Sequence, residues 1–416
     1  MRSPLFALAV VCLLAAVGAA ADARDAGDLQ RCLASQDLPR VARVRAPGGG
    51  ARFVRVLADR DGVPTRVAPI DPDDGDLAGV LARAAALPAD APGWEIPADE
   101  AAAQVCPPFA LSQAELDAGR RVVVAAGLNY AAHAEEAGGG DTFLFPKPAA
   151  PTPPYGVVAL PEGTVLLDYE VELGIVLLAD VDLRDLPDEE TLLGNAALFV
   201  ANDVTDREPI ITHAKLDGTS AGFVEAKGQP GFLPAGPWLV HGPALGRALF
   251  ACGSDGLGIR LAVDEGDGFR TRQDATTDLM LEEPLALLER IAAEVEAVGL
   301  RTAMPVRRGG ETRYYPLAVD AKTPRLPAGS VILTGTPEGV ALGRPDPAGL
   351  VLRGALRLRG PFEQFRREQL ARVAMGEPGG FLAPGDRVRA SIDGLGAQLL
   401  RIAASGTANP DPCAGP

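Results

Sequence analysis

Alternating carboxylates in one short segment are the most informative chemical feature of this chain. Asp168, Glu170 and Glu172 occupy every second position of the segment Asp-Tyr-Glu-Val-Glu-Leu that begins at residue 168. In an extended strand their side chains share one face, and the apolar run 175–178 carries the strand inward. Carboxylates crowded beside a buried strand either take up a proton or bind a cation, and Mg²⁺ is the natural oxygen-bound ion. A solvated acidic face on an edge strand would show the same pattern.

A histidine and a glutamate follow the apolar segment 122–126. Asn129 is placed to cap a short helix over residues 130–136, on which His133 and Glu136 are neighbours at i and i+3. A carboxylate bonded to one ring nitrogen orients the imidazole and raises its basicity, so the other nitrogen can take a proton from water. The pair therefore predicts a general base, and the alternative is a surface histidine beside acids.

Further polar residues stand at the ends of apolar segments. Asp203 is a candidate third metal ligand, and Arg207 is a candidate bidentate partner for a substrate carboxylate, unless the two only form an Asx turn paired with an arginine. Lys227 precedes apolar residues and is a candidate for stabilising a developing enolate, unless it is a solvated loop lysine. Thr336 lies in a hydroxyl-rich and glycine-rich turn that either holds a carboxylate or is an ordinary turn. His213 and His241 are interpreted as structural.

Composition limits the partners. The chain has 416 residues, a hydrophobic fraction of 47% and a charged fraction of 23%, which are typical of a soluble globular protein with a sizeable core. The net charge of -16 argues against nucleic acid or an anionic membrane as a partner. It does not exclude an anionic substrate, because a bound cation and a few basic residues reverse the local field.

The amino terminus predicts a signal peptide over residues 1–23. Arg2 precedes the apolar stretch 5–20, and small residues near Ala21 supply a cleavage site. No twin-arginine pair is present, and Val11 before Cys12 does not fit a lipoprotein signal, so we expect Sec-type export to the periplasm or medium. We expect no stable membrane span after signal removal, and the alternative is a retained anchor.

Four cysteines are left after that removal, namely Cys32, Cys106, Cys252 and Cys413. Export permits disulfides, with three possible connectivities. We expect Cys32 to pair with Cys106 and Cys252 with Cys413, and the alternative is unpaired or partly paired thiols. No Cys-x-x-Cys motif points to a zinc ribbon or a redox pair.

The pattern of apolar residues predicts an α+β fold, mainly β, with peripheral helices. Residues 24–118 are expected to form an N-terminal arm or small domain, residues 119–406 the main domain, and residues 407–416 a flexible tail. Gly- and Pro-bounded apolar runs predict strands throughout the second of these. The expected helices cover residues 77–87, 130–136, 188–199, 284–296 and 361–375. The last lies in an apparent insertion, 349–380, and is interpreted as a covering helix, with a lid or a dimer contact as alternatives.

Taken in order, these segments resemble the fumarylacetoacetate hydrolase family over residues 121–402. The resemblance rests on the ordered motifs Gly127-Leu128-Asn129-Tyr130 with His133 and Glu136, Asp168 to Leu173, Asn202 to Arg207, Lys227-Gly228, Gly236-Pro237-Trp238, Thr334 to Val340, and Gly385-Asp386 with Gly394-Leu395-Gly396. It implies a mixed β-roll, a homodimer, and a bound Mg²⁺, Mn²⁺ or Ca²⁺.

The resemblance also assigns roles to residues. Those implied are Glu170, Glu172 and Asp203 as metal ligands, His133, Glu136 and Lys227 as catalytic residues, and Arg207, Thr336 and Tyr130 as substrate-binding residues. The implied activity is hydrolysis of a C–C bond in an acylpyruvate or another 1,3-dicarbonyl or 2-oxo acid, through an enolate that the metal holds. Isomerisation, decarboxylation or hydration of a related 2-oxo or dienoic acid shares this chemistry, and a non-catalytic ligand-binding protein is the other alternative.

The chain departs from the family pattern at several places. Gln229-Pro230 replaces the usual Phe-Asp after the lysine motif, and Asp206 replaces a small residue beside Arg207. Inserts at about 300–315 and 349–380 can reshape the entrance. Export is also unusual for the family, so the resemblance does not carry over a particular substrate.

Overall fold

The computed structural model describes residues 26–46, 50–72, 75–97, 99–214, 221–308, 311–343, 346–376, 379–407 and 412. The predicted signal peptide, residues 1–23, and most of the predicted tail lie outside this part of the chain. No helix of the described residues has both the length and the apolar character needed to cross a membrane.

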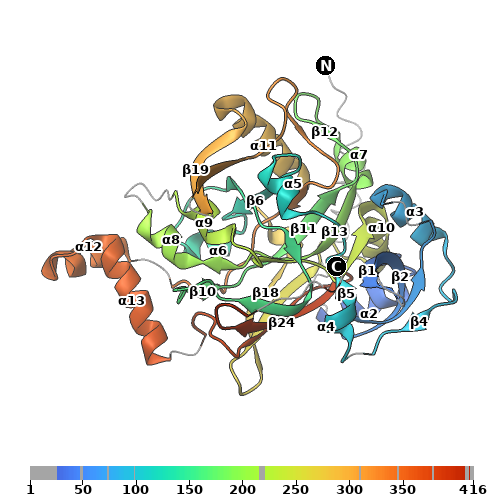
Figure 1. Cartoon of the computed structure of the whole chain (residues 1–416), viewed down its shortest axis with the longest axis horizontal. Coiled ribbons are helices and arrows are strands. Elements are labelled where there is room, and N and C mark those ends of the chain that lie inside the picture. The colour runs from blue at the N-terminus through green and yellow to red at the C-terminus, as the bar shows by residue number, and fades with distance from the viewer. Residues whose placement is uncertain are drawn as a thin grey trace.

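A large mixed sheet runs through the centre of the molecule (Figure 1). Its strands follow the order β4-β3-β2-β1-β16-β13-β11-β22-β6-β7, with β5 paired to β1. Within it β22 and β6 are parallel, and the other described pairs are antiparallel. The bounds are β1 Arg40–Arg45, β2 Ala51–Arg60, β3 Val63–Pro69, β4 Trp94–Glu95, β5 Val105–Cys106, β6 Val123–Gly127, β7 Phe143–Pro146, β11 Val171–Leu177, β13 Ala196–Asn202, β16 Trp238–His241 and β22 Val331–Leu333.

The central strands β11 and β13 consist entirely of buried residues. Both faces of the sheet are covered there, which explains why these strands are nearly continuous apolar runs.

A second sheet, in the order β18-β17-β23-β24-β9, packs against the first. The two sheets share one core, and Gln398 of β24 donates a hydrogen bond of 2.9 Å to the carbonyl of Val200 in β13. The bounds are β9 Tyr155–Ala159, β17 Gly258–Asp264, β18 Phe269–Thr276, β23 Arg387–Ile392 and β24 Gly396–Ala403. The mixed α+β architecture predicted from the sequence is thus confirmed.

Four small two-stranded pairs complete the strands. They are β8 Pro151–Thr152 with β15 Leu233–Pro234, β10 Leu167–Asp168 with β14 Thr205–Asp206, β12 Val181–Asp182 with β21 Arg325–Leu326, and β19 Arg301–Arg308 with β20 Glu311–Pro316.

The helices lie around the sheets. Their bounds are α2 Ala26–Ser35, α3 Leu77–Ala86, α4 Ala101–Gln104, α5 Gln113–Asp117, α6 Ala131–Glu136, α7 Glu189–Gly194, α8 Arg207–Thr212, α9 Phe223–Lys227, α10 Gly242–Cys252, α11 Pro284–Val298, α12 Pro347–Leu356 and α13 Pro361–Met375. The helix expected over 188–199 is wrong beyond Gly194, because residues from Ala196 onward form the buried strand β13. The expected helices near 77–87, 130–136, 284–296 and 361–375 are present.

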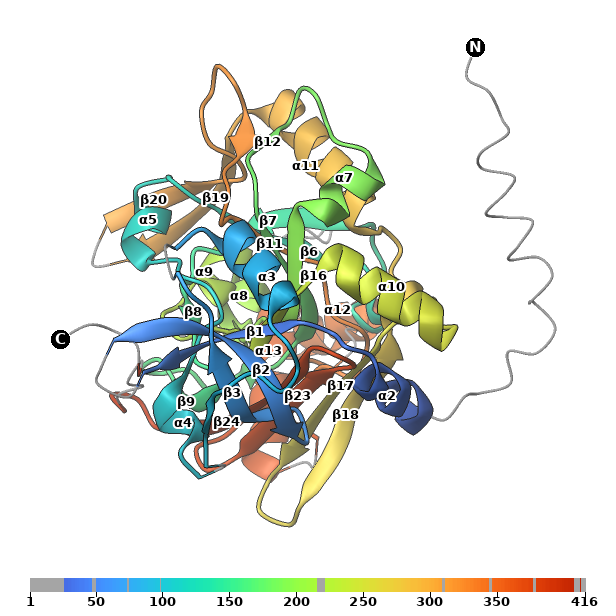
Figure 2. The same ribbon diagram turned by 90° about the vertical axis from the view of Figure 1, so that its right-hand side faces the viewer.

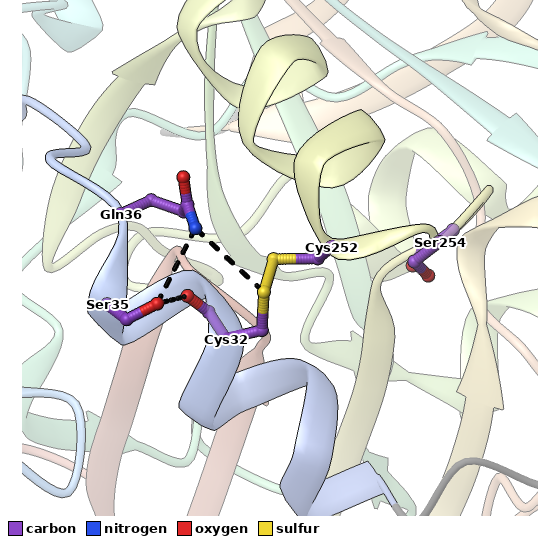
Figure 3. Close-up of a disulfide and its surroundings, with 6 residues drawn as sticks. Cys32, Ser35, Gln36, Cys252 and Ser254 are labelled. Carbon is purple, nitrogen blue, oxygen red and sulfur yellow. Dashed lines mark hydrogen bonds between the residues drawn. A yellow bond between two sulfur atoms is a disulfide. The ribbon is translucent and has the colours of Figure 1, made fainter.

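The N-terminal strands join the main sheet directly, because β1 pairs with β16 in antiparallel register (Figure 2). The proposed domain boundary near residue 118 stays a prediction, and the sheet runs across it. A disulfide also links the two parts, joining Cys32 of α2 to Cys252 of α10 (Figure 3).

This disulfide shows that the expected pairing of Cys32 with Cys106 and of Cys252 with Cys413 is wrong. Sequence spacing carries no information on which helices pack together, and here α2 packs on α10 across 220 residues of sequence. Cys106 is disulfide-bonded as well.

Candidate metal centre and active site

Three carboxylates meet where β11 and β13 lie side by side. Glu170 immediately precedes β11, Glu172 lies within it, and Asp203 follows β13, whose Asn202 pairs with Val171. The amide of Asp203 donates a hydrogen bond of 2.8 Å to the carbonyl of Glu170, which fixes the two segments to each other. One oxygen of each carboxylate lies within 4.8 Å of those of the other two, and all three residues are buried.

Lys227 places its ammonium group among these carboxylates. Its Nζ lies 2.5 Å from Glu170 Oε2, 2.7 Å from Asp203 Oδ2 and 2.8 Å from Thr205 Oγ1. Burial acts to lower the pKa of Lys227, but the charges of Asp203 and Glu170 outweigh it and raise that pKa. The residue is therefore a fixed positive charge inside the site.

Glu170 and Glu172 have opposite electrostatic surroundings. Burial acts to raise the pKa of Glu170, but Lys227, Arg207 and His133 together lower it. The pKa of Glu172 is raised well above its ordinary value by burial and by the negative charges of Asp203 and Glu170. Glu172 Oε2 accepts a hydrogen bond of 3.0 Å from the amide of Gly335, whereas its Oε1 is buried and accepts no hydrogen bond from the part of the chain that the structure describes.

These residues fit a hard divalent cation. A buried carboxylate oxygen without a hydrogen-bond donor is an uncompensated cost, and a cation beside it removes that cost. Three converging carboxylates are the donor set that Mg²⁺, Mn²⁺ and Ca²⁺ prefer. The cluster predicted from the alternating acids is thus assembled, and Glu170, Glu172 and Asp203 are the residues that would hold the ion.

Asp168 points elsewhere and has another task. Its Oδ2 accepts a hydrogen bond of 2.8 Å from Arg207 Nε, and its two oxygens also accept the amides of Ala341 and Leu342. Arg207 Nη2 lies 2.5 Å from Glu170 Oε1, so this guanidinium is engaged by two carboxylates of the chain itself. The substrate-binding role expected for Arg207 stays a prediction.

The histidine–glutamate pair is present on α6. His133 Nδ1 lies 3.2 Å from Glu136 Oε2, and the Glu136 carboxylate accepts the amide of Gly339. His133 is close enough to the metal cluster for its charge to act on Glu170. Gly339 has a φ of +98°, and a Cβ there would lie 1.9 Å from the carbonyl oxygen of Arg272, so this contact requires glycine.

Asn129 does not cap α6, contrary to the expectation. The N-cap is Tyr130, which makes no side-chain capping bond. Asn129 instead donates to the carbonyls of Thr334 and Glu282 and accepts the amide of Glu282, each at 2.8 Å. It fastens the loop after β6 to two distant segments, a tertiary role that a local capping rule does not reveal.

Tyr130 and Thr336 both contribute hydroxyl groups to the site, and the two hydroxyl groups differ in their hydrogen bonds. The Tyr130 hydroxyl is buried and has no hydrogen-bond partner among the described residues, and its pKa is raised by burial and then by the negative charge of Glu172. A bound molecule with a polar atom would satisfy this hydroxyl. Thr336 Oγ1 donates to the carbonyl of Val171 and accepts from Gln273 Nε2, at 2.9 and 2.8 Å.

Two buried residues that support the site were missed in the sequence. Lys147 Nζ lies 2.6 Å from Asp203 Oδ1 and donates a bond of 2.6 Å to the carbonyl of Lys227. Gln273 also accepts the amide of Val171, so its single side chain joins β11 to the turn of Thr336. A usable signal existed for the first, because the chain has only four lysines and Lys147 follows the apolar segment 143–146.

The comparison with known proteins agrees with the fold. The family described as "Fumarylacetoacetate (FAA) hydrolase C-terminal" matches residues 122–403, a range that holds all of the candidate site residues. The chain therefore belongs to the fumarylacetoacetate hydrolase family, whose members are enzymes.

Individual relatives are distant. The chain is 29% identical over 244 residues to Protein Rv2993c of Mycobacterium tuberculosis, covering 58% of this chain and 74% of that one. Its fold is similar to a fumarylacetoacetate hydrolase from Exiguobacterium antarcticum, with a TM-score of 0.52, 22% identity, and coverage of 88% and 99%. It is also similar to a 2-hydroxyhepta-2,4-diene-1,7-dioate isomerase from Mycobacterium marinum, with a TM-score of 0.50, 20% identity, and coverage of 89% and 100%.

Proposed function

We propose that this chain is a divalent-cation-dependent hydrolase that cleaves a C–C bond in an acylpyruvate or another 1,3-dicarbonyl acid. The observation that carries the proposal is the buried carboxylate cluster of Glu170, Glu172 and Asp203 beside the His133–Glu136 pair. The first is suited to polarising a substrate and the second to activating water, and hydrolysis needs both.

The reaction adds water across the bond between the acyl carbon and the neighbouring methylene carbon. The hydroxyl group of water goes to the acyl carbon, the electron pair of the broken bond stays on the methylene carbon, and a proton completes that carbon. The products are a carboxylic acid and, from an acylpyruvate, pyruvate; another 1,3-dicarbonyl acid gives the corresponding oxo acid. A divalent ion held by the three carboxylates would supply Lewis-acid polarisation of the substrate's oxygens.

The residues of the chain account for the other requirements. Glu136 holds the Nδ1 side of His133, so Nε2 is the ring nitrogen that is available to take a proton from water. Lys227 supplies a fixed positive charge where negative charge develops on the substrate. Tyr130 has an unsatisfied buried hydroxyl for a substrate oxygen.

We further propose that the protein is exported and works in the periplasm or the medium. The supporting observations are the apolar segment 5–20 and the disulfide between Cys32 and Cys252, since disulfides persist in oxidising compartments. The test is fractionation of producing cells, and exclusive recovery of full-length chain from the cytoplasm would contradict the proposal.

The activity test follows the enol absorbance of a small acylpyruvate with Mg²⁺ or Mn²⁺, and again with EDTA. We expect metal-dependent loss of absorbance with pyruvate among the products, and no loss in the Glu170→Ala variant. Products that retain every carbon would indicate isomerisation or hydration, and release of CO₂ would indicate decarboxylation. Either outcome would overturn the hydrolase assignment.

A further inference from the structure

The insertion after the Thr336 turn forms a helical hairpin, defined here as residues 347–376, which comprise α12 and α13. Arg353 Nε of α12 lies 2.8 Å from Glu368 of α13, which holds the two helices together. The hairpin contacts the body through Arg366 Nε, 2.8 Å from Glu208 of α8, and through Arg372, which donates to the carbonyl of Ala341. Figure 1 shows α12 and α13 projecting from one side of the body.

The hairpin concentrates apolar side chains in solvent. Of the 13 large hydrophobic residues that are exposed in the described parts of the chain, five lie within it. At its tip Val351, Leu352, Leu356 and Leu358 are 55%, 62%, 77% and 96% exposed. Clustered exposure of this kind marks an interaction surface rather than ordinary scattered surface residues.

The hairpin also has a net charge opposite in sign to that of the rest of the chain. It carries six arginines and two glutamates, which give it a net charge of +4. The whole chain has a net charge of -16, so the residues outside the hairpin have a net charge of -20. The tip, 350–359, has Arg353, Arg357 and Arg359 and no acidic residue. Among the described residues the exposed Arg357 side chain makes no hydrogen bond or ion pair.

A complementary surface lies elsewhere on the same chain. A hollow of about 290 Å³ beside β12 and α7 is lined by Asp180, Asp182 and Asp185 and by the apolar residues Val181, Leu186 and Leu192, among others. The segment 180–190 that borders it holds six acidic residues and one arginine, a net charge of -5. Asp180 is paired with Arg325 and Asp182 with Arg184, so Asp185 is the lining aspartate that has no ion pair among the described residues. The hollow therefore combines an apolar lining with a net negative rim, whereas the tip combines exposed leucines with arginines.

The tip and the hollow cannot meet within one molecule. Figure 1 places α12 at the left edge of the molecule, whereas α7 and β12 lie at the upper right of the body, far from α12. Contact between them therefore needs a second copy. An anionic membrane is a poorer occupant, because the body beside the hairpin carries the charge of -20 and would be repelled.

We propose that the hairpin tip of one copy docks into the acidic hollow of a second copy of this chain. Leu356 and Leu358 contact the apolar lining, and Arg357 faces the rim at Asp185. The contact joins two different surfaces, so reciprocal docking gives a closed dimer, and docking in one direction gives a ring or a chain of copies. Electrostatic attraction between the surfaces makes this assembly weaker at high salt.

The test is sedimentation velocity of the mature protein over a range of concentrations and NaCl levels. We expect self-association that weakens with salt, and we expect Arg357→Glu and Asp185→Arg each to raise the dissociation constant about tenfold or more. The double variant restores an opposite-charge pair, so its dissociation constant should return to within about threefold of the wild-type value. Arg60→Glu, at an exposed arginine on β2, is the matched control and should change nothing.

The apolar part is tested with Leu356→Glu and Leu358→Glu together, against Phe250→Glu on α10, where the phenylalanine is 84% exposed. Only the hairpin variant should weaken self-association. Circular dichroism and thermal melting show that each variant is folded before it is compared.

Three results would overturn the proposal. One is a wild-type protein that stays monomeric at all concentrations, and another is self-association that the hairpin and hollow variants leave unchanged. The third is failure of the double charge reversal to restore assembly. Co-sedimentation of a monomeric wild type with phosphatidylglycerol vesicles, abolished by the leucine substitutions, would identify a lipid surface as the occupant instead.

Discussion

Lys147 and Asp203 form a fully buried ion pair, with Lys147 Nζ 2.6 Å from Asp203 Oδ1 and no exposure of either side chain. The same ammonium group donates to the carbonyl of Lys227. Lys147 thus supports a candidate metal ligand and the C-terminal end of the helix that presents Lys227. Burial lowers the pKa of Lys147, against the attraction of Asp203.

Removing that cation should destabilise the metal-free protein. Lys147→Met removes one of the two ammonium groups beside Asp203 and leaves only that of Lys227 among the described residues. Removing one partner of a buried ion pair costs about 3–5 kcal/mol. Urea unfolding in EDTA measures the change. Lys322→Met, at an exposed lysine, is the control, and its effect should stay within about 0.5 kcal/mol. Equal effects of the two substitutions would show that the Lys147 pair does not stabilise the site.

Replacement of His133 separates the binding of the ion from the chemistry. His133 is not one of the three clustered carboxylates, so we expect His133→Ala to bind Mn²⁺ with unchanged affinity by calorimetry. Loss of the general base should reduce the hydrolysis rate by about 10²–10⁴. His241→Ala is the matched control and should keep full activity. It removes a ring that is hydrogen-bonded to the carbonyl of Gly194. Full activity of the His133 variant would disprove the assigned mechanism.

The raised pKa of Glu172 makes the stability of the metal-free protein depend on pH. The folded state retains a proton that the unfolded state releases near pH 4.5, the ordinary pKa of this carboxyl group. Stability from this group is therefore complete below pH 4.5 and is lost as pH rises toward the elevated folded pKa.

Thermal melting in EDTA measures this dependence in wild-type protein and in Glu172→Gln. We expect the melting temperature of the variant to fall less between pH 5 and neutrality, because glutamine has no proton to release. Parallel curves for the two proteins would show that Glu172 is not the titrating group.

Local sequence patterns predicted the elements that carry the site well. The alternation of Asp168, Glu170 and Glu172 indicated a strand, since period-two alternation is a local property. The strand β11 is present from Val171 onward, but Asp168 belongs to β10, and Glu170 lies between the two strands. The bounds of α13 were also predicted, and its start is marked by Pro361, which suits the first helical turn. α12 was missed, as its glycines and short length weaken the helical signal.

What sequence could not supply was the long-range pairing. Asp168 and Glu170 were expected to share a face, yet Asp168 binds Arg207 and the loop at Ala341, whereas Glu170 joins the metal cluster. The difference depends on which segments approach each carboxylate in three dimensions. Lys147 was missed for the same reason, because its partner Asp203 lies 56 residues further along the chain. The predicted pairing of the cysteines was wrong for the same reason, because Cys32 and Cys252 are 220 residues apart in the sequence.

The disulfide between Cys32 and Cys252 should contribute strongly to stability. It closes a loop of 220 residues and fixes α2 on α10, where Leu33 and Leu245 belong to one core cluster. Constraining so long a loop lowers the entropy of the unfolded chain, and disulfides of this kind typically contribute about 2–4 kcal/mol.

The variant with both Cys32→Ala and Cys252→Ala should therefore unfold at lower urea concentration, with its active-site residues and its affinity for Mn²⁺ intact. Because Cys106 forms a separate disulfide, the double variant isolates this bond, which reduction by dithiothreitol cannot do. An unchanged urea midpoint would mean that packing alone holds α2 on α10.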